Sequence, residues 1–86
     1  MPRYFFDWDV LGDVEVDRRG MRLPDISSAR EVATDCAVDL VADDIRRGDP
    51  QSVGTIIVRD DVGNDLHRIT LAEARELALL ASTTLQ

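Results

Sequence analysis

An amphipathic helix in the middle of the chain constrains the fold more than any other sequence feature. Small and apolar residues recur there at steps of three and four, which is the pattern of a helix with one buried side. These residues are Ala29, Val32, Ala33, Cys36, Ala37, Leu40, Val41 and Ile45. Because a lone helix cannot bury this stripe, the flanking segments must form the surface that covers it.

Both ends of this helix carry sequence signals. Ser28 and Glu31 have the spacing of a capping box, and Asp25 and Ser27 are competing N-caps. At the other end stand two cations that suit the helix dipole, a glycine that can adopt the left-handed conformation, and an Asp-Pro pair that cannot continue the helix. These residues are Arg46, Arg47, Gly48, Asp49 and Pro50.

The segments before the helix predict strands. Residues 3–10 alternate with a period of two, with Tyr4, Phe6 and Trp8 on one side, which is typical of a half-buried strand. Residues 14–16 return as a short second strand, and residues 21–23 run extended into a proline.

The segments after the helix predict a hairpin and a second helix. Residues 53–59 are β-branched, residues 60–63 fit a turn closed by glycine, and residues 66–69 pair back. A second capping box at Thr70 opens a helix that runs through about Ala81. We therefore predict one α+β domain over residues 1–86, in the order ββαββα. An antiparallel sheet of about four strands is packed by one long helix, with a shorter C-terminal helix.

Composition excludes several classes of function. The net charge of −7 disfavours nucleic-acid binding and anionic membranes, and it favours a basic protein partner. One cysteine and one histidine give no disulfide and no zinc cluster, so no cofactor or metal is predicted. Neither a signal-peptide core nor an apolar run of membrane-spanning length is found, so we expect a cytoplasmic protein.

A set of short motifs occurs in a characteristic order. The chain opens with Pro2-Arg3-Tyr4-Phe5-Phe6, and the turns Asp17-x-x-Gly20 and Asp60-x-x-Gly63 flank Leu23-Pro24-Asp25 with Ala29 and Ala33. This set resembles a family of short bacterial proteins, common in rhizobia, that is known only as a domain of unknown function. The resemblance covers Pro2 to about Leu71 and implies a fold without an activity. Members often carry histidine after the phenylalanine pair, where this chain has Asp7.

A second resemblance is to the antitoxin partner of small toxin–antitoxin pairs. Antitoxins of this kind place a Pro-Asp segment, a polar helix cap and an alanine-rich helix after a sheet, as Pro24-Asp25 and residues 27–37 do here. The Gly-Cys signature of those proteins and their DNA-binding tail are missing. An antitoxin-like function is therefore kept as the alternative.

Four carboxylates form the main candidate binding surface. Glu31, Asp35, Asp39 and Asp43 lie four residues apart, so they line one side of the long helix and end beside Arg47. This acidic ridge could bind arginines of a partner, or those of a second copy. A solvated face that aids solubility is the simpler alternative. A metal site is disfavoured because one exposed helix does not enclose an ion.

Other residues that might carry chemistry have simpler interpretations. Asp60, Asp61 and Asp65 lack the closing glutamate of a calcium loop, so a hairpin turn is expected. Cys36 lies on the apolar stripe and is predicted to be buried, and nothing places His67 beside it as a base. The aromatic strand face is assigned to the core rather than to base stacking. A small hydrolase is therefore disfavoured.

The C-terminal helix is apolar almost all round. Leu77 and Ala78 can face the sheet, so Leu79 or Leu80 would need another surface to cover it. We predict a homodimer through Leu77, Leu79 and Leu80, with a frayed terminus as the alternative. In sum, the sequence predicts a non-enzymatic interaction or regulatory module that is acidic and dimeric.

Overall fold

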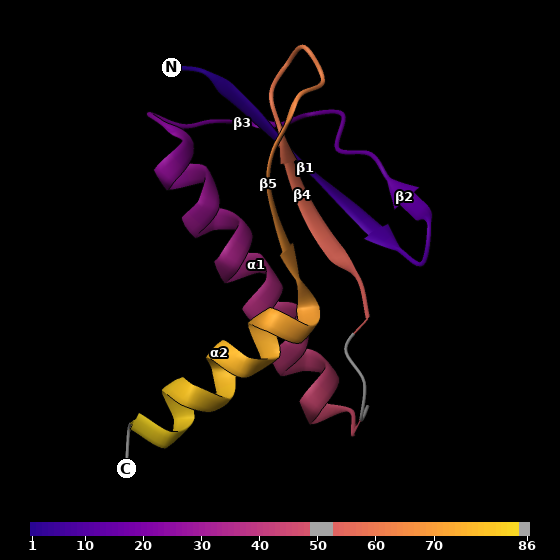
Figure 1. Ribbon diagram of the computed structural model, residues 1–86, viewed down its shortest axis with the longest axis vertical. Helices are drawn as coiled ribbons and strands as arrows, with labels where there is room; N and C mark the ends of the chain where they lie inside the picture. The colour runs from indigo at the N-terminus through magenta and orange to yellow at the C-terminus, as the bar shows by residue number, and fades with distance from the viewer. Residues whose placement is uncertain (49–52, 85–86) are drawn as a thin grey trace.

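The computed structural model describes residues 1–48 and 53–84, with side chains described up to residue 80. The chain forms a five-stranded antiparallel sheet and two helices (Figure 1). In chain order these are β1 (Arg3–Val10), β2 (Asp13–Glu15), β3 (Met21–Arg22), α1 (Ile26–Arg46), β4 (Thr55–Arg59), β5 (Asp65–Thr70) and α2 (Leu71–Thr84). The predicted α+β class is confirmed. The fifth strand arises because residues 21–22, expected only to run extended, pair with β1.

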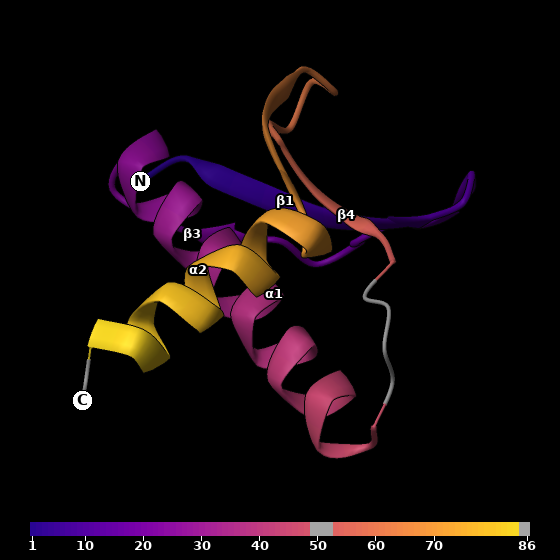
Figure 2. The same ribbon diagram turned by 60° about the horizontal axis from the view of Figure 1, so that its bottom comes forward.

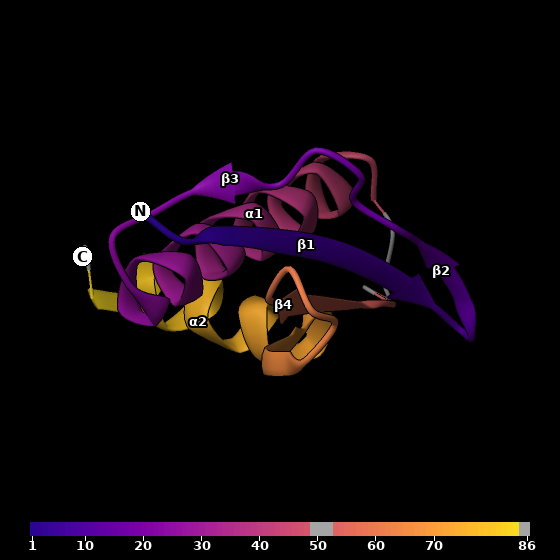
Figure 3. The same ribbon diagram turned by 90° about the horizontal axis from the view of Figure 1, so that it is seen from above.

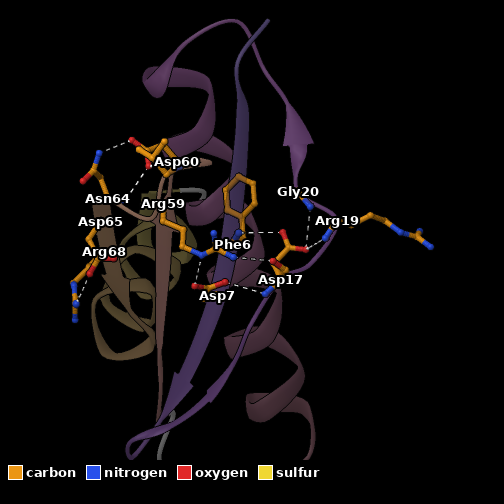
Figure 4. A network of polar contacts seen from close by, with 11 residues as sticks. Phe6, Asp7, Asp17, Arg19, Gly20, Arg59, Asp60, Asn64, Asp65 and Arg68 are labelled. Atoms are coloured by element: carbon orange, nitrogen blue, oxygen red, sulfur yellow. Dashed lines mark hydrogen bonds and ion pairs between the residues drawn. The ribbon is translucent and has the colours of Figure 1, made fainter.

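Strand β1 organises the sheet, whose order is β2-β1-β4-β5. One edge of β1 pairs with β4 over Phe5–Asp9. The other edge is shared by two short strands: β2 pairs at Trp8–Val10 and β3 at Arg3–Tyr4 (Figure 4). Between them the chain leaves the sheet as a loop over residues 16–20, opposite the middle of β1.

Both helices cover the same face of the sheet and leave the other face open (Figure 2). Three alanines and a valine of α1, spaced four residues apart, are fully buried, because small side chains let the helix approach the strands closely. These are Ala29, Ala33, Ala37 and Val41. They pack with Tyr4, Ile56, Val58, Ile69, Leu71 and Ala74 from the strands and α2.

Local signals set the ends of the helices. Asp25, one of the competing caps, is the N-cap of α1: its backbone is extended and its carboxylate accepts the Ser28 N–H at 2.8 Å. The Ser28 capping box is therefore wrong, and the helix starts three residues earlier, at Ile26. Gly48 has the predicted left-handed conformation with φ 75°, while Asp49 and Pro50 lie outside the described residues. Thr70 caps α2 as predicted, accepting the Glu73 N–H at 3.0 Å.

The apolar stripe is narrower than its periodicity predicts. Cys36 and Ile45 are exposed rather than buried, and Leu77, expected to face the sheet, is 47% exposed. The fully buried residues of α1 lie in one row, with Ile26, Val38 and Leu40 partly buried beside it. Cys36 and Ile45 fall outside this contact and reach solvent. Across the described residues, no helix combines the length and apolarity needed to cross a membrane.

Candidate functional site

The loop over residues 16–20 is held to the sheet by Asp17. One carboxylate oxygen of Asp17 accepts the Phe6 N–H of β1 at 3.1 Å. The other accepts the N–H groups of Arg19 and Gly20 at 3.0 and 3.1 Å. The Asp17 side chain thus takes the place of a paired strand at the middle of β1 (Figure 4). This explains the Asp17-x-x-Gly20 spacing as a requirement of the fold.

Asp7 and Arg59 complete the network on the open face of the sheet. Asp7 is only 7% exposed, and it accepts the Arg59 Nε–H at 2.7 Å and the Asp17 N–H at 2.9 Å. Arg59 also donates to the Asp17 carbonyl at 2.9 Å, and its guanidinium lies 4.5 Å from the centre of the Phe5 ring. Both carboxylates therefore accept backbone N–H groups, and that of Asp7 also binds Arg59. These contacts hold the loop over residues 16–20 to the sheet.

The electrostatics of Asp17 predict an acid-sensitive loop. Partial burial opposes ionisation of Asp17, but the N–H donors of Gly20, Phe6 and Arg19 and the charge of Arg59 outweigh it, so its pKa lies below the ordinary 3.8. A pKa depressed by folding adds stability that is present above the unfolded pKa and is lost as the pH falls through the folded pKa. We expect Asp17→Asn to lose part of the dependence of unfolding free energy on pH below the ordinary aspartate pKa. Urea denaturation across that range measures it, and an unchanged slope would contradict the assignment.

The four carboxylates of the acidic ridge form one exposed row on α1. Glu31, Asp35, Asp39 and Asp43 are all exposed, on the side of the helix opposite its buried alanines. The ridge ends beside Arg46, whose guanidinium contacts Asp43 at 2.5 Å.

The cations near this end are paired differently from the prediction. Arg47, expected beside the ridge, instead pairs with Asp44 at 2.6 Å. Among the described residues, no ion pair involves the other three carboxylates of the ridge.

Cys36 lies beside the acidic ridge, and its surroundings disfavour the reactive thiolate form. Partial burial, followed by the nearby charges of Asp39 and Asp35, raises the pKa of its thiol. A raised pKa reduces the thiolate fraction, which is the nucleophilic form. His67 lies on β5 opposite Val58, and no hydrogen bond between described residues joins it to Cys36. The two side chains do not form a catalytic pair in this structure.

The remaining predicted sites are structural or exposed. Asp60 accepts the Val62 and Asn64 N–H groups at 3.1 and 2.8 Å, so the predicted hairpin turn is confirmed. In the part of the chain that the structure describes, no three histidine, cysteine or acidic residues are grouped as metal ligands. On α2, Leu77, Leu79 and Leu80 are 47, 54 and 64% exposed.

Sequence reasoning missed the surroundings of Trp8. Tyr4 and Phe6 join the core as predicted, but the Trp8 ring reaches past it and borders several surface hollows. The indole Nε1 is buried and has no hydrogen-bond partner among the described residues. It lies against Gly54, where a Cβ atom would stand 2.6 Å from it. The alternation of residues 3–10 predicts that Trp8 lies on the helix side of the sheet. It does not predict whether the helices reach far enough along the sheet to cover the ring.

The fold and the loop over residues 16–20 define the class of this protein. It is a small α+β domain with one antiparallel sheet, in which short sequence motifs form the turns and the helix cap. Residues 3–72 match the family described as Domain of unknown function (DUF6894), and the chain belongs to this family. The match ends at residue 72, so most of α2 lies outside it. No curated protein and no solved structure matches the chain. The resemblance to a domain of unknown function is thus confirmed, whereas the antitoxin resemblance stays a prediction.

Proposed function

We propose that this protein is a non-enzymatic interaction module whose acidic ridge binds a basic surface of a partner protein. The observation that carries the proposal is the exposed row of four carboxylates, three of which have no ion pair among the described residues. Like charges one helical turn apart destabilise a helix by roughly 0.2–0.5 kcal/mol per pair. A row of arginines on a partner would remove this repulsion.

A charge-matched pair of variants tests the ridge. Asp35→Asn/Asp39→Asn removes two ridge charges, and Asp61→Asn/Glu76→Gln removes two exposed charges elsewhere. We expect the ridge variant to bind a labelled oligo-arginine peptide about fivefold more weakly than wild type, from roughly 0.5 kcal/mol per exposed ion pair. The control variant should bind like wild type in the same fluorescence-anisotropy titration. Equal weakening of both variants would show that only net charge matters and would reject the ridge.

The homodimer predicted from α2 remains part of this proposal. Three exposed leucines on one short helix form an apolar surface of the kind that marks protein contacts. A two-fold contact there would leave the acidic ridge on α1 available for the basic partner.

Light scattering tests the contact through α2. We expect Leu79→Gln/Leu80→Gln to lower the solution mass of the assembly by half while circular dichroism stays unchanged. The control is Leu11→Gln/Val62→Gln, which removes two apolar side chains exposed in turns. An unchanged mass in the α2 variant, or the same loss in the control, would rule out an interface on this helix.

A further inference from the structure

The β1–β2 hairpin carries a groove on the side that faces the helices. Register places Glu15 beside Trp8 and Asp13 beside Val10 on this side. One hollow of about 470 Å³ and a second of about 380 Å³ share Trp8 and Glu15 in their walls, so they adjoin along the hairpin and are together called the hairpin groove. The hairpin extends beyond the helical layer (Figures 1 and 3). Among the described residues, none from α1 or α2 lines either hollow.

The two ends of this hairpin groove carry opposite charges. Arg18 and Arg19 line one end, and Asp13 lines the other, with Glu15 near the middle. All four side chains are exposed, and among the described residues none of them takes part in an ion pair. The backbone of the loop that carries the two arginines is fixed by the hydrogen bonds of Asp17, so both side chains start from a defined place beside the groove.

We propose that a second copy of this chain binds in the hairpin groove across a two-fold axis near Trp8. A two-fold interface brings residue i of one copy to residue j of the other, and j to i, so the surface must complement itself. The hairpin groove has this property, because two antiparallel grooves bring Arg18 and Arg19 of each copy to the acidic end of the other. A uniformly acidic or basic partner would be repelled at one end.

Apolar side chains of β1 support the same occupant. Phe6, Trp8 and Val10 line the two hollows from the same face of the strand, so the contact would bury apolar area as well as pair charges. The acidic ridge and α2 do not contribute to this contact. The contact between two copies through the hairpin groove can therefore form, or fail to form, independently of the proposed function.

Charge-swap variants test the proposal directly. Arg18→Glu/Arg19→Glu makes both ends of the groove acidic, and Asp13→Arg/Glu15→Arg makes both ends basic. We expect each variant to lose self-association through the groove at concentrations where wild type associates, because like charges facing each other are repelled. An equimolar mixture of the two should restore the contact, since each acidic end then meets a basic end.

Two readouts separate this contact from the others. Light scattering gives the mass, and the emission of Trp8, the only tryptophan of the chain, reports whether the groove is covered. We expect a blue shift on association that appears in wild type and in the mixture, appears in neither variant alone, and weakens with added salt. If neither variant differs from wild type in mass and emission, or if mixing restores nothing, the proposal is wrong. The oligo-arginine and α2 tests would remain unaffected.

Discussion

Replacing Arg59 with leucine is expected to destabilise the fold by about 3 kcal/mol, near the lower end of the range for breaking a buried ion pair. The variant leaves the Asp7 carboxylate buried with only the Asp17 N–H as a donor. It also removes the hydrogen bond to the Asp17 carbonyl and the contact with the Phe5 ring. The free energy of unfolding from urea denaturation measures the loss.

An exposed arginine of the same sheet provides the control. Arg68 pairs with Asp65 at 2.6 Å, but both side chains are about half exposed, so Arg68→Leu should change stability by less than about 1 kcal/mol. The double variant Asp7→Leu/Arg59→Leu should recover part of the loss, because the unpaired buried charge is gone. Equal effects of the two single variants would contradict the central role given to Arg59.

The parts of the fold that depend on near neighbours could be predicted from the sequence. The cap at Thr70, the glycine stop at Gly48 and the turn at Asp60 each use bonds within four residues, and each was predicted in place. Asp25 was one of three competing caps, since Asp25, Ser27 and Ser28 all have side chains that can accept a hydrogen bond from the first turn. The local sequence therefore does not show which of the three side chains caps the helix.

The network around Asp7 could not be predicted because its partners are distant in the chain. Arg59 lies 52 residues from Asp7 and 42 from the Asp17 carbonyl to which it donates. The pattern of residues 3–10 placed Asp7 on the face away from the helices, where an aspartate is expected to be exposed. Burial of its carboxylate follows from the loop and from Arg59, which no local pattern brings together.

The motifs that carry the family resemblance now have structural explanations. Asp17 and Gly20 fix the loop, Asp25 starts α1, and Asp60 closes the hairpin turn. These bonds fix turns and a helix cap, so the motifs support the surfaces on which the acidic ridge and the hairpin groove lie.

Gly20→Ala is the second substitution expected to have a large effect, with a loss of about 3 kcal/mol. Gly20 has φ 68°, a conformation that costs other residues about 1 kcal/mol. A Cβ atom there would stand 2.9 Å from the Tyr4 carbonyl oxygen, the Phe5 ring and the Arg3 side chain, and overpacking of this kind adds roughly 2 kcal/mol. The carbonyl belongs to β1 and cannot rotate away, so the loop must move and weaken the bonds to Asp17.

Gly63→Ala separates the two contributions to this loss. Gly63 has φ 92°, but a Cβ atom there would meet nothing within 4 Å, so its replacement should lose only the backbone part, about 1 kcal/mol. Urea denaturation of both variants gives the difference. A difference near 2 kcal/mol would assign the Asp17-x-x-Gly20 spacing to close packing against β1. Equal losses would mean that the loop can yield, and that the arginines of the hairpin groove are less firmly placed than the self-complementary contact requires.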